Sequence, residues 1–343
     1  MCSLKHWYLA VASLTVLLVA PAFAQTGAAP ASQPAPMQMS SLEQTGRTDP
    51  FPPVNPKFFT ATTPTVETVN NFLKALWGYD PNRIWRVEAV LATPAPGVSK
   101  VVVAVSDKSP NAKVQSTSFF VTPDGAHAIA GEGVVPFGNA PFAPVRRLLA
   151  EKADGPSTGA ASKDLELVEF ADLQCPHCKE GQTTMDQLAK DFPGAHIVYQ
   201  PYPLVDIHPF AFKAATYGYC VAQQKSSAYL DYARAVYDTQ GGLTQDSADQ
   251  TLKDAVVKAG LDAGAIDTCA ATQAAKDAVN ASIKLGDAAG VDQTPMLVVN
   301  GHPLPLTGIP YETLKTLIAF QAQEDGVSAA AVQAPARTAP SLK

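Results

Sequence analysis

The stretch that decides the fold runs from residue 165 to residue 178 and reads Leu-Glu-Leu-Val-Glu-Phe-Ala-Asp-Leu-Gln-Cys-Pro-His-Cys. Its apolar first part, Leu165–Phe170, is typical of a short buried strand, and the polar residues from Lys179 to Asp191 predict a helix after it. Cys175 and Cys178 therefore lie where the strand passes into the helix. Two cysteines at this spacing can close a small disulfide, and the unpaired amide groups of the helix start favour a thiolate.

The two residues between the cysteines indicate the direction of electron flow. Pro176 suits the first helical turn because proline has no N–H group to leave unpaired there. His177 further favours the anion and so stabilises the reduced form, and a disulfide whose reduced form is stabilised is an oxidant. The motif therefore predicts a redox-active pair that tends to oxidise its substrates.

Two other interpretations of the motif stay open at this point. The pair could be half of a zinc site, with His177, Cys220 or Cys269 as further ligands, or it could be an inert structural disulfide. The sequence contains no second Cys-x-x-Cys and no closely spaced pair of histidines. We therefore expect neither a metal nor an organic cofactor.

Two further positions complete the candidate site. Thr294-Pro295 precedes the apolar strand Met296–Asn300, and a cis proline there would turn the chain beside the disulfide and leave the Thr294 backbone free to pair with an extended substrate. Glu169 lies inside the apolar strand before the motif. A carboxylate buried behind the disulfide would have a raised pKa and could relay protons to Cys178. The alternatives are an ordinary strand-edge proline and a surface glutamate.

The chain has 343 residues and five cysteines, and its N-terminus predicts export. Residues 1–24 combine a positive start, an apolar run from Trp7 to Ala20 and an Ala-x-Ala site, which is the pattern of a signal peptide. We expect cleavage after Ala24, with an uncleaved membrane anchor as the alternative. Cleavage removes Cys2 and leaves four cysteines in an oxidising compartment, where an even number suggests pairs.

The pairing of the remaining cysteines depends on the role of the motif. If Cys175 and Cys178 are the redox pair, Cys220 and Cys269 are left to form a second, structural disulfide. Its loop of 49 residues would stabilise the fold by roughly 4 kcal/mol on the chain-entropy model. The alternative is two free buried thiols.

Composition and periodicity divide the rest of the chain. The net charge of −6 argues against a basic nucleic-acid binder, and 46% hydrophobic residues are enough to build a core. The segments rich in Ala, Pro, Gln and Ser near both ends read as disordered. The predicted organisation is a signal peptide over 1–24, a tether over 25–60, an α+β domain over 61–138, a linker helix and flexible joint over 139–162, a catalytic domain over 163–323 with a helical insert at about 208–290, and a tail over 324–343.

The α+β domain is expected to hold one helix and an antiparallel sheet. Thr63-Pro64 reads as a helix start, and apolar residues then recur at helical spacing as far as Leu76. Turn-like segments rich in proline, glycine and aspartate separate the runs that follow. The predicted strands are Ile84–Leu91, Val98–Val105, Gln115–Val121 and Ala126–Val135.

The second half of the chain resembles the thioredoxin-fold disulfide oxidoreductases of the bacterial periplasm, and within them the DsbA-like group. The resemblance implies that Cys175 is the exposed nucleophile, that Cys178 resolves the mixed disulfide, that Pro295 is the cis proline and that Glu169 is the buried acid. It also implies a membrane redox partner of the DsbB or DsbD kind. The residues that carry it are Val168-Glu169-Phe170, Cys175-Pro176-His177-Cys178, Tyr202-Pro203-Leu204, His208-Pro209, Ala214-Ala215, Cys220-Val221-Ala222 and Gly290-Val291 through Thr294-Pro295-Met296.

The first domain is similar to the cystatin-like N-terminal dimerisation domain of DsbC and DsbG, on the residues Pro94-Ala95-Pro96-Gly97 and Pro123-Asp124-Gly125 and on the linking helix after Gly138. Those relatives are homodimers that isomerise or reduce disulfides. Pro-His between the cysteines is the DsbA choice, whereas threonine before the proline is the DsbC and DsbG choice.

The expectation is therefore an α/β thioredoxin fold with a helical insertion behind a small dimerisation domain. The expected protein is a periplasmic homodimer that oxidises or isomerises disulfides in exported proteins. The alternatives are a reductase and a redox-independent chaperone or peptide-binding protein.

Overall fold

The computed structural model describes residues 50–51, 53–109, 111–131 and 133–327 of the chain. The expected signal peptide, most of the expected tether and most of the expected tail lie outside the described residues. Within the range assigned to the tether, a short 3-10 helix, η1, spans Pro56–Phe58, and Phe59 forms a bridge to Val90.

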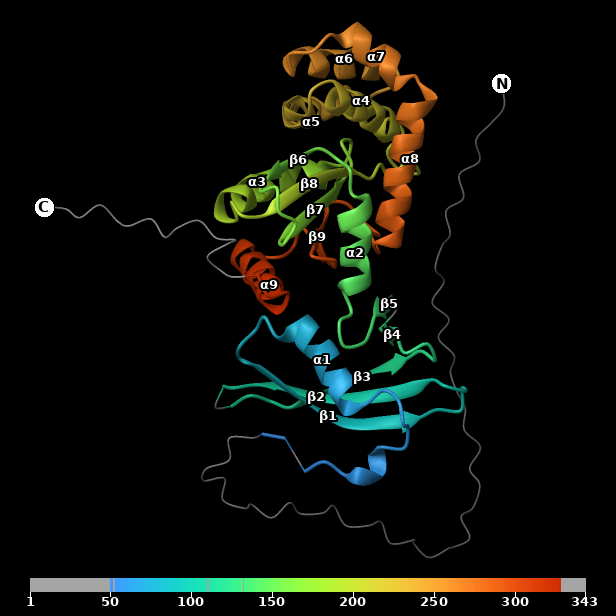
Figure 1. Cartoon of the computed structure of the whole chain (residues 1–343), viewed down its shortest axis with the longest axis vertical. Coiled ribbons are helices and arrows are strands. Elements are labelled where there is room, and N and C mark those ends of the chain that lie inside the picture. The colour runs from blue at the N-terminus through green and yellow to red at the C-terminus, as the bar shows by residue number, and fades with distance from the viewer. Residues whose placement is uncertain (1–49, 52, 110, 132, 328–343) are drawn as a thin grey trace, which may run out of the picture. The chain divides into compact units, whose positions relative to one another are not determined.

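The first domain consists of one helix packed on one face of an antiparallel sheet (Figure 1). Helix α1, Val66–Trp77, begins where the Thr65 hydroxyl accepts a hydrogen bond from Thr68 N at 3.1 Å. The expected start at Thr63-Pro64 was wrong by two residues, because Thr65 rather than Thr63 caps the helix. The strands are β1 Arg83–Ala92, β2 Ser99–Asp107, β3 Gln115–Val121, β4 His127–Ala130 and β5 Gly133–Pro136.

The last predicted strand of this domain is in fact a hairpin. Residues 126–135 were expected to form one strand, but β4 and β5 pair antiparallel, with Ile129 opposite Val134. Gly131 lies between the two strands with φ of 61°, a backbone conformation that glycine adopts without steric cost.

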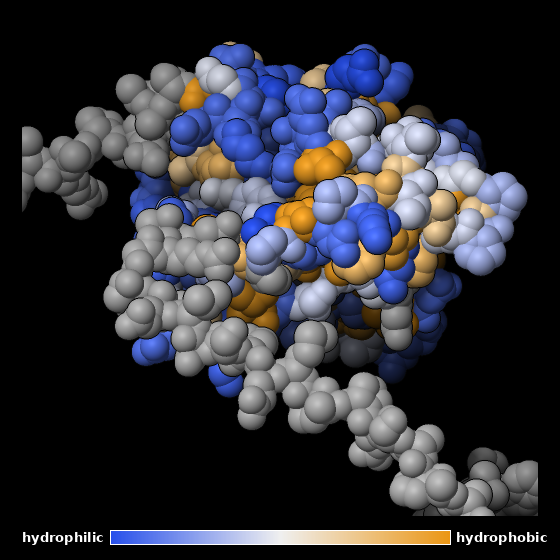
Figure 2. Space-filling view, turned by 90° about the horizontal axis from the view of Figure 1, so that it is seen from below, coloured by the Kyte–Doolittle hydropathy of each residue, from blue (hydrophilic) through white to orange (hydrophobic). Residues whose placement is uncertain are grey.

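Viewed from below, the molecule presents hydrophobic side chains interspersed with hydrophilic ones (Figure 2).

The core of this domain lies between α1 and the sheet. Side chains from the apolar stripe of α1 meet the inward-facing residues of the strands, and three phenylalanine rings contact one another there with centroids 4.9 to 6.1 Å apart. The buried residues of this core are Val69, Phe72, Leu73, Val87, Val90, Val101, Val103, Phe119, Val121, Ala128 and Phe137.

The second domain is built on a mixed sheet with strand order β10-β9-β7-β8-β6. The central strand β7 runs parallel to β8 and antiparallel to β9, so both of its edges are paired. Residues 157–159 were expected in a flexible joint, but they form β6 and pair with β8. The strand bounds are β6 Ser157–Gly159, β7 Glu166–Ala171, β8 His196–Pro201, β9 Met296–Val299 and β10 His302–Pro305.

Alternate residues of β7 enter two different cores, as the period of a strand requires. Leu167 packs with α3, α9 and the helical insert, whereas Val168 and Phe170 pack with α2 and α8 on the other face. Glu169 shares the face of Leu167 and is thereby directed toward α3. The helices that cover these faces are α2 Ala143–Lys152, α3 Pro176–Asp191, α8 Gln273–Ala288 and α9 Tyr311–Glu324.

The helical insert between β8 and β9 is a stack of short helices (Figure 1). It holds aromatic and small apolar side chains in the larger of the two cores of this domain, among them the fully buried Tyr217 and Tyr232. Beyond α9, Asp325 accepts a hydrogen bond from Asn300 Nδ2 and pairs with Arg146, so the first residues of the expected tail belong to the fold. Besides α8, the insert contains α4 Ala211–Gln224, η2 Ser226–Ala228, α5 Tyr229–Asp238, η3 Gln240–Gly242, α6 Ala248–Lys258 and α7 Ala263–Ala270.

Candidate active site

The two cysteines of the motif lie at the start of α3, directly after the central strand. Cys175 is the N-cap residue with extended backbone, and Pro176 occupies the first helical turn, where its missing N–H costs nothing. Both cysteines are free thiols. The resemblance implied an exposed Cys175, and this was wrong: the residue is 4% exposed because it packs into the core of the domain. Cys178, one turn into the helix, is fully buried.

The Cys175 sulfur is set up as a thiolate. A hydrogen bond from the Cys178 thiol, helped by the backbone N–H groups of Cys178 and His177, outweighs burial and lowers the pKa of Cys175 from 9.0 to about 5. The sulfur lies 3.6 Å from Thr294 O. At neutral pH Cys175 is therefore an anion, the form in which a cysteine reacts.

Cys178 has the opposite character. Burial, followed by the hydrogen bond and charge of Cys175, raises the pKa of the Cys178 thiol well above its usual range. Asp172 N donates to the Cys178 sulfur at 3.3 Å. Cys178 thus stays protonated while Cys175 is ionised, so it can act only after a base has taken its proton.

Glu169 places a buried carboxyl group behind the pair. It is 1% exposed on β7, and burial raises its pKa from 4.5 to about 8, against a small opposing effect of its hydrogen bond with Gln182. The Gln182 amide nitrogen lies 3.2 Å from Glu169 Oε1 and 3.4 Å from Cys178 O. Gln182 therefore connects the carboxyl group to the backbone of the second cysteine.

The remaining predicted positions surround the sulfurs in different ways. The Thr294–Pro295 peptide bond is cis, and the Thr294 hydroxyl is buried without a hydrogen-bond partner among the described residues. His177 is exposed, and its Nδ1 lies 3.0 Å from Glu180, which, together with the Cys175 charge, raises the pKa of the imidazole. A positive charge at His177 favours the neighbouring thiolate.

Polar residues that sequence reasoning did not single out hold the loop before Cys175. Asp172 is buried, and its carboxylate accepts from Leu204 N at 2.8 Å and lies 2.7 Å from His208 Nδ1. Gln174 Oε1 accepts from Phe210 N at 2.8 Å. A polar residue directly after an apolar strand and just before the motif was a usable signal for Asp172.

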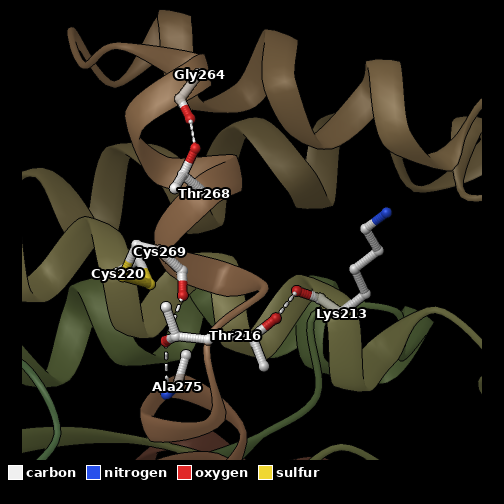
Figure 3. Close-up of a disulfide and its surroundings, with 8 residues drawn as sticks. Lys213, Thr216, Cys220, Gly264, Thr268, Cys269 and Ala275 are labelled. Carbon is white, nitrogen blue, oxygen red and sulfur yellow. Dashed lines mark hydrogen bonds between the residues drawn. A yellow bond between two sulfur atoms is a disulfide. The ribbon is translucent and has the colours of Figure 1, made fainter.

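A disulfide joins Cys220 on α4 to Cys269 on α7, inside the helical insert (Figure 3). Its Cα atoms are 5.9 Å apart, and Cys220 is 1% exposed. The Thr272 hydroxyl, next along the chain, donates to Cys269 O at 2.7 Å and accepts from Ala275 N at 3.3 Å, which caps α8. The bond is part of the insert's core and lies outside the redox motif.

Replacing both Cys220 and Cys269 by serine should lower the free energy of unfolding by about 4 kcal/mol, because the open loop of 49 residues gains entropy in the unfolded chain. For a domain of this size the melting temperature should fall by about 10 °C. Thermal unfolding followed by circular dichroism measures this. A double variant that melts with the parent would contradict the assigned structural role.

Two other properties of the described part of the chain bear on the site. Within residues 50–327, apart from positions 52, 110 and 132, no group of three or more His, Cys, Asp or Glu side chains lies close enough to hold a metal ion. None of the helices in these ranges is both long and apolar enough to cross a membrane.

Residues 151–319 match the family model described as Thioredoxin. Together with the strand order and the helix that starts at the cysteine motif, this match confirms the expected thioredoxin-like fold. Among curated proteins, the Na(+)/H(+) antiporters NhaA 3 of Salinispora tropica and NhaA 1 of Salinispora arenicola are 32% and 33% identical over 66 and 57 residues. These matches cover 19% and 17% of this chain, which spans about a tenth of the length of either relative.

Three solved structures illustrate the likeness. A periplasmic thioredoxin-like protein from Salmonella enterica serovar Typhimurium is 19% identical over 52% of this chain and 97% of its own, with a TM-score of 0.43. The catalytic domain of ScsC from Proteus mirabilis is 22% identical over 52% and 98%, also at 0.43. Oxidised BdbD from Bacillus subtilis is 16% identical over 49% and 93%, at 0.44.

Proposed function

Because residues 151–319 form a thioredoxin-like domain, we propose that this chain is a thiol–disulfide oxidoreductase that oxidises cysteines in its substrates. The observation that carries the proposal is the contrast between the two sulfurs. Cys175 has a pKa of about 5, whereas the Cys178 pKa is raised by burial. A stabilised thiolate favours the reduced form of the pair, and the pair is then an oxidant.

The chemistry follows from this contrast. A substrate thiolate attacks the Cys175 sulfur of the oxidised pair, a new S–S bond forms to the substrate, and Cys178 leaves and takes up a proton. Glu169, protonated below about pH 8, supplies that proton. A second substrate thiolate then attacks the substrate sulfur of the mixed disulfide, so the substrate gains a disulfide, Cys175 leaves as a stable thiolate, and the pair has accepted two electrons.

The reverse direction uses the same groups. The Cys175 thiolate attacks a substrate disulfide, and the Cys178 thiol must lose a proton before it can release the substrate. Repetition of both directions on one substrate would isomerise its disulfides. In this proposal an extended substrate segment pairs with the Thr294 backbone, whose carbonyl lies 3.6 Å from the Cys175 sulfur.

The equilibrium of the Cys175–Cys178 pair with glutathione tests the proposal. An oxidant or isomerase should show a reduction potential of about −120 to −180 mV, and a reductant one near about −270 mV. A redox-independent chaperone would bind unfolded polypeptide equally well whether or not its cysteine pair exchanges with glutathione. A pair that does not exchange with glutathione contradicts the proposed function.

The proposed site of action is the periplasm, after removal of residues 1–24. The Cys220–Cys269 disulfide supports this, because structural disulfides persist in oxidising compartments. The proposed substrates are exported proteins with cysteines. A membrane redox protein of the DsbB or DsbD kind would restore the active disulfide.

The first domain is proposed to join two copies of the chain. Phe120, Ile129 and Val134 lie directly opposite one another on three neighbouring strands, on the sheet face away from α1, and are 40%, 40% and 66% exposed. Residues that are opposite in neighbouring strands form one continuous row. An exposed apolar row of this kind is typical of an interaction surface.

Replacing Ile129 by glutamate should separate the dimer, because two carboxylates would be buried without partners in the shared face. Sedimentation should then give half the mass of the parent. Val257→Glu is the matched control, since Val257 is 61% exposed on α6, outside the row. A parent that sediments as a monomer, or an Ile129→Glu variant with unchanged mass, would refute the dimer.

A further inference from the structure

The backbone just before the nucleophile is fixed by a side chain from the helical insert. Gln240 begins the 3-10 helix η3, which follows α5. Its amide nitrogen donates to Leu173 O at 3.0 Å and to Cys175 O at 3.0 Å. A glutamine amide has two N–H groups, so both are used, and they bind the carbonyls on either side of Gln174.

The Cys175 carbonyl, which the Gln240 amide binds, also belongs to the first turn of α3. Besides the Gln240 amide, it accepts from Cys178 N at 3.2 Å and from Lys179 N at 3.3 Å, which form the first turn of α3. The orientation of this carbonyl therefore sets the direction of the first N–H groups of the helix. The N–H groups of His177 and Cys178 in this turn also help to lower the pKa of Cys175.

Other contacts tie Gln240 to the same part of the molecule. Helix α5, which carries the chain to Gln240, packs against α3, and Arg234 pairs with Asp186 at 2.8 Å between the two helices. The Gln240 backbone is held too, since Leu243 N donates to its carbonyl at 2.9 Å. The insert thus holds the backbone of Gln240 in place beside the loop that its amide binds.

We propose that Gln240 is a positioning residue for thiol–disulfide exchange, which fixes the Leu173 and Cys175 carbonyls and so orients the helix start toward the Cys175 sulfur. The proposal rests on the proposed function. The helical insert then takes part in setting the oxidising strength of the pair. The positive end of the Gln240 amide also favours the Cys175 thiolate, because it lies against the backbone of the residue that bears the anion.

The Gln240 amide acts on the site from outside the cysteine motif. Cys-Pro-His-Cys and the helix start are both local, and Gln240 is separated from Cys175 by 65 positions. Removing its donors leaves the motif, Thr294 and Glu169 in place. Any change in the redox equilibrium would therefore come from the backbone that the amide holds or from the charge of the side chain at position 240.

Two variants of nearly the same size test this in the full chain. Gln240→Leu removes both donors, and Gln240→Glu replaces them by an acceptor that repels both the carbonyls and the thiolate. The assay is the equilibrium in which the oxidised pair and two glutathione thiols give the dithiol and glutathione disulfide. The second readout is the pH midpoint of Cys175 alkylation by iodoacetamide. Gln250→Leu is the control, because Gln250 is exposed on α6 and donates to Asp254.

We expect the two Gln240 variants to change the redox equilibrium by different amounts. Gln240→Leu should lower the equilibrium constant for reduction about fivefold, which is about 20 mV, and should raise the alkylation midpoint by about half a pH unit. Gln240→Glu should lower the constant at least tenfold, and Gln250→Leu should match the parent. Loss of a bond that only stabilises the fold would lower the melting temperature and leave both readouts unchanged.

The outcomes separate the two proposals. A parent that does not exchange with glutathione overturns the proposed function. A parent that exchanges, with both Gln240 variants within twofold of it in the equilibrium constant and unchanged in the alkylation midpoint, overturns the role of Gln240 alone. If Gln240→Leu or Gln240→Glu does not fold, Gln240→Asn, whose amide is one methylene short of the carbonyls, takes its place and should move both readouts in the same direction.

Discussion

Replacing Cys175 by serine should reduce thiol–disulfide exchange to the uncatalysed background, whereas Cys178→Ser should accumulate mixed disulfides with substrates. The Cys175 sulfur is the only one of the pair that ionises at neutral pH, with a pKa of about 5, and a serine hydroxyl does not replace a thiolate. In Cys178→Ser the nucleophile is kept, but the thiol that releases the substrate is absent. Mass spectrometry of the non-reduced protein after incubation with a disulfide substrate distinguishes the two variants.

The disulfide of the insert provides the control for this experiment. The Cys220→Ser and Cys269→Ser double variant should exchange disulfides at the rate of the parent at temperatures where it is folded, because its bond lies between α4 and α7. Substrate bound through Cys178 rather than Cys175 would contradict the assigned roles. So would exchange above background in Cys175→Ser.

Replacing Glu169 by glutamine should stabilise the protein at neutral and higher pH. Burial raises the pKa of this carboxyl group from 4.5 to about 8, so the folded state favours the protonated form. Its contribution to stability is complete below about pH 4.5 and is lost as the pH rises toward 8, by roughly 3–5 kcal/mol in all. The variant has no such loss, and the difference in unfolding free energy between variant and parent should grow over this range.

Urea unfolding of the reduced proteins between pH 5 and 8 measures this difference. Cys175, with its lowered pKa, gains stability as the pH rises, but it does so in both proteins and cancels in the comparison. The same variant should release substrate from the mixed disulfide roughly 10²-fold more slowly, because the base that takes the Cys178 proton is gone.

Glu166→Gln is the matched control for Glu169. Glu166 is also buried on β7, three residues earlier, and it pairs with Lys163 at 3.2 Å. An odd spacing along a strand places the two side chains on opposite faces. Equal release rates in Glu169→Gln and the parent would show that Glu169 is not the proton carrier, whatever its effect on stability.

The local parts of this molecule were predictable from sequence. A strand, two cysteines and a helix within 27 residues follow from short-range periodicity, and the structure forms β7 and α3 there. Proline at the helix start and glutamate inside an apolar strand are also local patterns. They led to Pro176 and Glu169 because each residue departs from its surroundings in a way that chemistry explains.

Long-range placement could not be predicted in the same way. Gln240 looks like any polar residue in a loop, and only the fold brings its amide to the Cys175 carbonyl. Residues 157–159, with serine, threonine and glycine, have a turn composition, and they become β6 because β8 offers an unpaired edge. Pairing of this kind depends on the partner strand and leaves no local periodicity to detect.

The order of strands in the second domain also governs how the chain folds. The central strand β7 pairs on one edge with β8, which follows it closely in the sequence, and on the other with β9. Leu167 can therefore pair with Val299 only after the whole helical insert between them has been made. Closing so large a loop before any contact is gained slows folding and leaves an unpaired strand edge exposed meanwhile. A chain that emerges N-terminus first will thus keep that edge open until nearly all of the domain has appeared.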